Sequence, residues 1–256
     1  GENSNASAAG TQNETATVQD ESADSNTDST GSTTSLVQDN RVLQIPDDNY
    51  RTYYELFVYS FYDSDGDGIG DLQGVLEKLD YLNDGDDTTD MDLGINGIWL
   101  MPVMPSVTYH KYDTTDYENI DPQYGTLETF QELLTACHDR GIRVILDLAM
   151  NHSSSSHPWF QQAAEYLKSL PEGAEPDSSE CPYMDYYHFS REYQGGYAQL
   201  DGTAWYYEAR FWDGMPDLNL ENETVRREFE QIADFWLDMG VDGFRLDAVK
   251  EDVTGS

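Results

Sequence analysis

The sequence is poor in basic residues. Only 13 Lys and Arg stand against 50 Asp and Glu among 256 residues, which gives a formal net charge of -37 at pH 7. A chain this acidic repels phosphate backbones and anionic lipid, so its composition argues against nucleic acid and membrane surfaces as partners. Neutral ligands and cations suit it better, although an acidic surface is also a common way to keep a protein soluble.

Cysteine and long apolar runs are scarce as well. The two cysteines, Cys137 and Cys181, are too few to define a disulfide framework, and we expect both to be free thiols. No run approaches the roughly 20 apolar residues that are needed to cross a bilayer, and no signal peptide is recognisable. We therefore expect no membrane-spanning segment.

Aromatic residues, in contrast, are plentiful. They make up 12% of the chain, with 18 Tyr and 5 Trp, and hydrophobic residues make up 38%. This composition indicates a globular protein with a sizeable core and an aromatic-rich surface of the kind that often binds sugars. The length suits one large α/β domain.

Residues 1–40 differ from the rest of the chain. They contain no Lys, no Arg and no aromatic residue. Such a segment cannot bury enough apolar surface to offset its ordering entropy, so we predict a disordered, acidic, Ser/Thr-rich linker over 1–40. On composition alone, a spacer that tethers an exported or lipid-anchored protein and a plain disordered terminus are equally open.

From Tyr50 onward, short apolar runs alternate with longer amphipathic ones, which is typical of βα units. We expect strands at Tyr53–Tyr59, Gly97–Pro102, Arg143–Leu148 and Gly243–Leu246. We expect helices at Leu72–Leu82, Leu127–Arg140 and Thr224–Met239, the last two followed by left-handed caps at Gly141 and Gly240. The connection between the third and fourth strands is far longer than a βα loop, and residues 153–220 of it lack clean helical periodicity, so we predict an irregular inserted module there.

The segment from Asp63 to Asp71 places carboxylates at alternate positions with glycines between them. A hard, oxygen-seeking cation requires this arrangement, and Ca²⁺ is its natural occupant. Five groups could supply ligands: the side chains of Asp63, Asp65, Asp67 and Asp71, and the carbonyl of Ile69. An EF-hand loop is disfavoured because Gly74 stands where the bidentate Glu belongs, and a plain acidic turn would have to hold four Asp together against their repulsion.

Polar residues also follow the predicted strands. Tyr112 and Asp113 come after the second strand, and Asp147 and His152 end the third. α/β barrels keep their chemistry at the carboxyl ends of their strands, although each of these residues alone could be an ordinary loop or turn residue.

Arg245 and Asp247 lie two positions apart on the fourth predicted strand, so both project to the same side. A neighbouring Arg favours the ionised form of a carboxylate, which a glycosidase nucleophile needs because it attacks as the anion. An Arg/Asp pair at a strand end could also be a simple ion pair.

In this order the motifs resemble the signature regions of the α-amylase family, glycoside hydrolase family 13. They are the acidic loop, Asp147-Leu-Ala-Met-Asn151-His152, Met215-Pro-Asp217-Leu-Asn219 and Gly243-Phe-Arg245-Leu-Asp247. The resemblance implies an α/β fold, a (β/α)₈ TIM barrel with an inserted domain B after strand 3, of which about the first four βα units are present. It divides the chain into the linker 1–40, barrel domain A over 41–152, domain B over 153–220, and domain A again over 221–256.

The resemblance also implies roles for single residues. Asp247 would be the nucleophile and Arg245 would keep it ionised, whereas Asp147 would be structural to the site. Further residues would border the sugar subsites: Tyr112, Asp113, His152 and, on the leaving-group side, Lys250. Asn151 matches a calcium ligand of many α-amylases, but enzymes with the Asp63–Asp71 loop often lack that second site, so it is left out.

The implied protein is a monomeric, Ca²⁺-binding glycosidase, extracellular or tethered to the cell surface, that cleaves α-1,4-glucosidic bonds in an α-glucan substrate. Glu251 stands where many α-amylases have His, and the family's general acid is expected downstream of Ser256, so residues 1–256 alone should be inactive. Two alternatives stay open. An exo-acting oligo-1,6-glucosidase or α-glucosidase shares the acidic loop but more often has Gln at the Met215 position, and a non-catalytic relative that acts as a binding module usually loses the nucleophile or its Arg.

Overall fold

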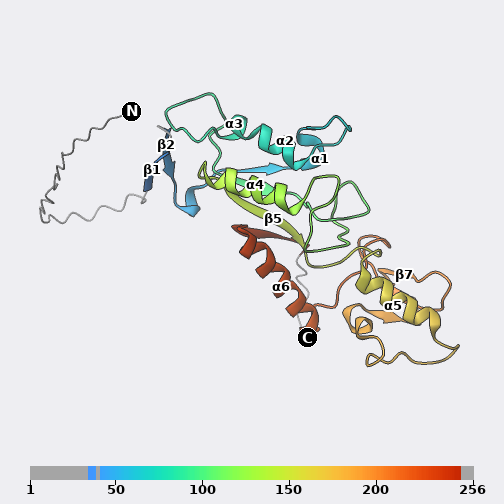
Figure 1. Cartoon of the computed structure of the whole chain (residues 1–256). Helices are drawn as coiled ribbons and strands as arrows, with labels where there is room; N and C mark the ends of the chain where they lie inside the picture. Colours follow the sequence, from blue (N-terminus) through green and yellow to red (C-terminus); the bar gives the residue numbers. More distant parts are fainter. Residues whose placement is uncertain (1–33, 39–40, 249–256) are drawn as a thin grey trace, which may run out of the picture. The chain divides into compact units, whose positions relative to one another are not determined.

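A computed structural model of the chain describes residues 34–38 and 41–248. Its central feature is a parallel sheet of four strands, in the order β3-β4-β5-β9 (Figure 1). The strands are β3 (Tyr53–Leu56), β4 (Gly97–Leu100), β5 (Arg143–Ala149) and β9 (Gly243–Asp247). All four predicted strands are therefore confirmed, but β3 is shorter than predicted because the chain turns into the short helix α1 (Val58–Phe61) directly after it.

The two faces of this sheet carry different side chains. Side chains alternate along a strand, and the register places Ile98 beside Val144 and Leu100 beside Leu146. These residues are buried and belong to the apolar core, which the helices share. The opposite face carries polar groups near the strand ends, including Asp147. Burial thus fixes which strand residues are available for chemistry.

Four helices follow the strands: α2 (Leu72–Glu77), α3 (Leu79–Leu82), α4 (Leu127–His138) and α6 (Glu223–Met239). The predicted helix over 72–82 is divided at Lys78, whose backbone leaves helical geometry and whose ammonium lies 4.1 Å from the centroid of the Tyr62 ring. The left-handed conformation predicted for the glycines after α4 and α6 is confirmed, with φ of 72° at Gly141 and 110° at Gly240.

A two-stranded hairpin overlaps the end of the predicted linker 1–40, whose boundaries stay a prediction. β1 (Thr34–Gln38) pairs antiparallel with β2 (Arg41–Ile45), and the register places Leu36 opposite Leu43 and Val37 opposite Val42. Both halves of this hairpin contain Val and Leu, which suit strands better than the Ser and Thr that precede them. Residues 1–33 lie outside the described residues.

The long connection between β5 and β9 contains more regular structure than predicted. It holds α5 (Pro158–Ser169), the 3₁₀ helix η2 (Pro182–Tyr186) and a three-stranded antiparallel sheet of β6 (Phe189–Ser190), β8 (Tyr206–Glu208) and β7 (Tyr197–Gln199). Figure 1 shows α5 and β7 grouped together, apart from α2, α3 and α4. The boundaries of a separate domain B stay a prediction.

Helix α5 was missed because its buried stripe contains two small residues. Phe160, Ala163, Ala164 and Leu167 are buried at the spacing of one helix face. The alanines make this stripe look weak in sequence, although Pro158 at the first turn and His157, whose side chain accepts the Trp159 amide, mark the start of the helix.

Both cysteines are buried and neither forms a disulfide. Burial raises the pKa of the Cys137 thiol to about 12, so that thiol is unreactive at neutral pH. Among the helices in the described part of the chain, none combines the length and the apolar character that crossing a bilayer requires.

Candidate active site

Asp147 lies at the centre of a hydrogen-bonded cluster at the carboxyl end of β5. Its side chain is buried, and Oδ2 accepts hydrogen bonds from the Tyr112 hydroxyl at 2.9 Å and from Trp99 Nε1 at 3.1 Å. Arg245 Nη1 donates to Oδ1 at 3.1 Å. A buried carboxylate is costly unless it is hydrogen-bonded and paired with a cation, and Asp147 meets both conditions.

Arg245 joins Asp147 to Asp247. The pairing of β5 with β9 places Arg245 opposite Asp147 and Asp247 opposite Ala149, so these polar side chains share one face of the sheet. Arg245 Nη1 also donates to Asp247 Oδ1 at 2.6 Å, and the guanidinium lies 5.1 Å from the centroid of the Trp99 ring. The Asp247 carboxylate is therefore held by a cation that is itself fixed on Asp147.

Burial and hydrogen bonding act in opposite directions on Asp147. Burial raises the pKa of Asp147 above its usual value, whereas the hydrogen bonds from Tyr112, Arg245 and Trp99 lower it. Burial and the Asp147 charge also raise the pKa of the Tyr112 hydroxyl, so that hydroxyl stays protonated and keeps donating. Loss of one of these donors should raise the pKa of Asp147 further.

His152 supports the backbone of Tyr112. Its Nε2 lies 3.0 Å from the Tyr112 carbonyl oxygen, which only accepts, so Nε2 carries the proton. Burial lowers the pKa of His152, which keeps the ring neutral at neutral pH. Within the described residues Nδ1 has no hydrogen-bond partner, and the Phe211 ring lies 5.4 Å from the imidazole. The His152 side chain is buried, whereas Phe211 is exposed to solvent.

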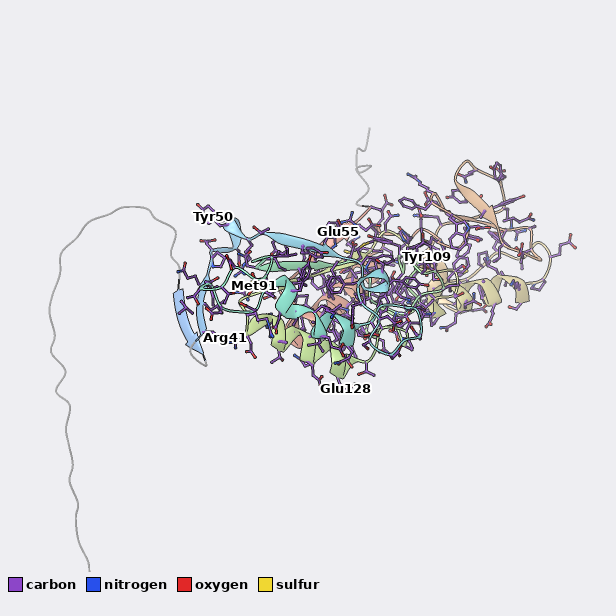
Figure 2. The ribbon with its side chains drawn as sticks, turned by 90° about the horizontal axis from the view of Figure 1, so that it is seen from above. Arg41, Tyr50, Glu55, Met91, Tyr109 and Glu128 are labelled. Carbon is purple, nitrogen blue, oxygen red and sulfur yellow. The ribbon has the colours of Figure 1, made fainter. Side chains whose placement is uncertain are left out.

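Lys111 stabilises the same loop through a buried ion pair. Its side chain is only 1% exposed, and Nζ donates to Asp121 Oδ2 at 2.7 Å and to Gln123 Oε1 at 3.0 Å, with the Tyr124 ring centroid 4.7 Å away. Its backbone is left-handed, with φ of 63°, which is uncommon for a residue other than glycine. An ion pair therefore holds a strained turn next to Tyr112. Figure 2 shows the exposed ring of Tyr109 from this loop at the opposite end of the sheet from Arg41 and Tyr50.

The structure does not bring every predicted residue to the cluster. Asp113 is buried, and its carboxylate accepts from the Val107 amide at 3.1 Å, from the Thr108 amide at 3.3 Å and from the Thr108 hydroxyl, all in its own loop. Lys250 lies outside the described residues. The contacts to sugar that the sequence predicts for these residues stay predictions.

The acidic loop after α1 forms a second group of carboxylates. One oxygen from each of Asp63, Asp65 and Asp71 lies within 4.8 Å of the others. Backbone amides hold these side chains: Asp63 accepts from Gly66 and Gly68, and Asp71 caps α2 through the amide of Gly74. The hydrogen bonds from Gly68 and Gly66 lower the pKa of Asp63, so its carboxylate is ionised at neutral pH.

Three of the five predicted calcium ligands thus converge. Glycines with positive φ, 83° at Gly66 and 94° at Gly68, make the tight turns that allow this convergence. The Asp67 carboxylate accepts the Ile69 amide instead and is outside the convergent group. Grouped carboxylate oxygens fit a hard cation such as Ca²⁺. The part of Asp67 and of the Ile69 carbonyl in such a site stays a prediction.

With this geometry in place, comparison with known proteins identifies the class. Residues 55–253 match the family model described as the alpha-amylase catalytic domain. This match covers more than half of the chain, and the chain therefore belongs to the α-amylase family of glycoside hydrolases. Its four-stranded parallel sheet with helices is part of the family's (β/α)₈ barrel.

Curated relatives include both α-amylases and glucosidases. The chain is 48% identical over 204 residues to Alpha-amylase 3 of Dictyoglomus thermophilum, a match that covers 77% of this chain and 36% of that protein. It is 38% identical over 210 residues to an oligo-1,6-glucosidase of Parageobacillus thermoglucosidasius, covering 77% of this chain and 34% of the relative. The chain therefore spans about a third of the length of these relatives.

Solved structures give the same assignment. Eubacterium rectale Amy13B is 65% identical, with a TM-score of 0.73 over 78% of this chain and 37% of that one. The α-amylase from H. orenii is 49% identical, with a TM-score of 0.66 over 78% of this chain and 40% of that one.

Three contributors to the site escaped sequence reasoning. Trp99 looks like an ordinary core residue of β4, and only strand register reveals that its indole reaches Asp147. Lys111 is of a residue type that is normally exposed. Phe211 lies far along the chain from His152, in a segment without a recognisable pattern, and nothing local in the sequence indicates their contact.

Proposed function

We propose that the enzyme containing this chain hydrolyses α-1,4-glucosidic bonds of starch and malto-oligosaccharides with retention of configuration, and that Asp247 is its nucleophile. The observation that carries this proposal is the 2.6 Å hydrogen bond from Arg245 to Asp247, in which the Arg is itself bound to buried Asp147. A carboxylate fixed by a cation at the carboxyl end of a barrel strand is suited to attack as the anion.

In the first step Asp247 attacks the anomeric carbon while the bond to the leaving oxygen breaks and a carboxylic acid protonates that oxygen. Water then attacks the same carbon, gives up its proton to the resulting carboxylate, and releases Asp247. Retention requires the two carboxyl groups to lie about 5 to 5.5 Å apart. We place the second carboxyl group, the general acid, beyond residue 256.

The other residues of the cluster position the nucleophile. Arg245 fixes the Asp247 carboxylate, and Asp147 fixes Arg245. Tyr112, held through its hydroxyl on Asp147 and its carbonyl on His152, presents its half-buried ring beside the cluster, where it can pack on the sugar ring. These contacts fix the Asp247 carboxylate and the Tyr112 ring through several hydrogen bonds, which limits the reorganisation that attack requires.

We also propose Ca²⁺ as a structural cofactor, held by Asp63, Asp65 and Asp71. The ion would neutralise the repulsion among these carboxylates and brace the loop between α1 and α2. The predicted acidic linker over 1–40 suits a protein that acts outside the cell or tethered at its surface, where the enzyme would meet polymeric glucan.

Trapping tests the nucleophile directly. The enzyme should form a covalent adduct on the peptide that contains Asp247 when it is treated with an activated 2-deoxy-2-fluoro α-maltosyl fluoride, as detected by mass spectrometry. Asp247→Asn should form no adduct and should lose starch hydrolysis by on the order of 10⁴-fold. Purified residues 1–256 should be inactive. Starch hydrolysis by that fragment that survives Asp247→Ala would contradict both the assignment and the need for a second carboxyl group.

An exo-acting oligo-1,6-glucosidase is the second candidate, because relatives with that name match the chain at 38% identity. Met215 before Pro216, where that branch more often has Gln, favours the α-amylase. Products released from amylose separate the two: a ladder of maltodextrins indicates endo attack, and glucose alone indicates exo attack. An enzyme that binds amylose but releases neither product would instead be a binding module.

A further inference from the structure

Two large aromatic side chains are exposed side by side in the connection after β8. Phe211 is 58% exposed and Trp212 is 48% exposed. Exposing a Trp to water is unfavourable, and a protein that orders such a ring at its surface commonly uses it to bind a partner. The segment around it, residues 209–216, is well anchored rather than loosely placed.

The anchors lie on both sides of Trp212. The Met215 amide donates to the Trp212 carbonyl at 2.8 Å, and the Ser155 amide donates to the Gly214 carbonyl at 2.8 Å. The Tyr207 hydroxyl donates to the Asp213 carbonyl at 2.7 Å. The backbone that carries Trp212 is therefore fixed to the chain after β5 and to β8.

Gly214 fixes the ring as well as the backbone. The six-membered ring of Trp212 folds back over Gly214 so closely that a Cβ at residue 214 would overlap it. Only glycine allows this approach, since the φ of Gly214 is not positive and places no other demand on the residue. The indole is thus supported on one side by the backbone and remains partly open to solvent.

The segment runs beside the candidate active site. Phe211 lies against His152, with ring centroids 5.4 Å apart, and His152 is bonded to the Tyr112 carbonyl. Ser153, the next residue after His152, donates its amide to the Pro216 carbonyl at 3.2 Å. Trp212 therefore follows directly on Phe211, which packs on the His152 ring that holds the Tyr112 backbone.

We propose that Trp212 is a stacking platform for a glucose unit of a bound α-glucan, one that lies beyond the unit held at the cluster. The proposal rests on the proposed function and adds to it that the enzyme recognises extended chains rather than single linkages. A neutral sugar suits this acidic protein, and the apolar face of a pyranose packs on an aromatic ring. Because the ring is already ordered, binding costs little side-chain entropy.

Chain length is the variable that tests this platform. In the full-length enzyme, Trp212→Ala should raise KM for maltoheptaose about tenfold, the loss expected for one aromatic stacking contact, while kcat stays unchanged. KM and kcat for 4-nitrophenyl α-glucoside or maltose, which the proposal confines to the units next to the cleaved bond, should stay within about twofold. Gly214→Ala should reproduce this pattern, because it displaces the ring without removing an aromatic atom.

Tyr193→Ala is the matched control. Tyr193 is 70% exposed in the same inserted segment, and its ring packs on Tyr206, so its loss should leave both substrates unaffected. Thermal unfolding of each variant reports whether it folds, and Gly214→Ala provides the test if Trp212→Ala does not fold.

The outcomes separate the two proposals. If the wild-type enzyme cleaves no α-glucan of any length, the proposed function fails. If it cleaves maltoheptaose and Trp212→Ala leaves the KM for maltoheptaose unchanged, or changes both substrates equally, the platform is overturned while the proposed function stands. A Trp212→Ala variant that alters only self-association, measured by sedimentation, would show that the ring binds a protein surface and would also overturn it.

Discussion

The two groups of aspartates in this chain are held by different kinds of donor. Asp147 and Asp247 are held by side chains, above all Arg245, and Asp147 is buried. Asp63 and Asp65 in the acidic loop are exposed or half-buried and accept mainly backbone amides. Side-chain donors can shift position when the charge on a reacting group changes, whereas backbone amides hold their acceptors in one fixed arrangement. The first arrangement suits catalysis and the second suits a resident cation.

Removal of the central cation should have the largest effect. Arg245→Met leaves Asp147 buried without a charged partner and leaves Asp247 unsupported, so kcat on starch should fall on the order of 10³-fold. Reducing-sugar release measures this, with Arg245→Lys as the control that keeps the charge but cannot reach both carboxylates equally. Activity of Arg245→Met within tenfold of wild type would show that side-chain donors are not what activates Asp247.

The buried ion pair between Lys111 and Asp121 is a further case of an aspartate held by a side chain. Lys111→Met leaves Asp121 buried without a cation, so the free energy of unfolding should fall by about 3 kcal/mol. Denaturant unfolding measures this loss. Lys168→Met, on the surface of α5, is the control and should change little. Equal free energies of unfolding for the two variants would mean that backbone amides alone stabilise the buried Asp121 carboxylate.

Removal of one neutral donor should have a smaller effect. Tyr112→Phe takes away a hydrogen bond that favours ionised Asp147, so kcat/KM should fall about tenfold. The pKa of Asp147 should rise, because the lost bond stabilised the charged form, and the acid limb of the pH profile should move to higher pH. Tyr109→Phe, in the same loop, should leave the profile in place. An unchanged acid limb in Tyr112→Phe would separate Asp147 from the pH dependence of catalysis.

The amide-held loop should respond to chelation instead. EDTA should lower the Tm of the wild-type enzyme by roughly 5 °C, and Ca²⁺ should restore it, because a bound ion stabilises only the folded state. Asp65→Ala should have the lower Tm in either condition. Asp86→Ala, in another acidic loop, should keep the full response to EDTA. If Asp65→Ala also keeps it, the cation lies elsewhere.

Sequence patterns predicted the strands and placed Asp147, Arg245 and Asp247 at their carboxyl ends, because apolar runs followed by polar residues reflect burial that each strand requires locally. Trp99 and Lys111 depend on partners distant in sequence, and no local pattern predicts such partners. The same applies to α5, whose alanines are buried because small side chains allow close packing, and this packing cannot be predicted from the local sequence.

The limits of the acidic loop prediction have a similar cause. Alternating aspartates indicate that carboxylates can converge, but which of them do so depends on local turns. Asp67 is taken up by the Ile69 amide, two residues away, and Asp71 divides its carboxylate between Ser64 and the start of α2. Such short-range competition for aspartate oxygens cannot be read from spacing alone.

The bond between Arg245 and Asp147 joins residues 98 positions apart in the chain. While a ribosome is still making the inserted segment, Asp147 and Tyr112 already exist, but their cation does not. The Asp147 carboxylate at the end of β5 therefore lacks its cation until β9 is synthesised and pairs with β5. Docking of that strand completes the charge pair and brings Asp247 to the site in the same event, so the two carboxylates and their shared cation come together only when the fourth strand has joined the sheet.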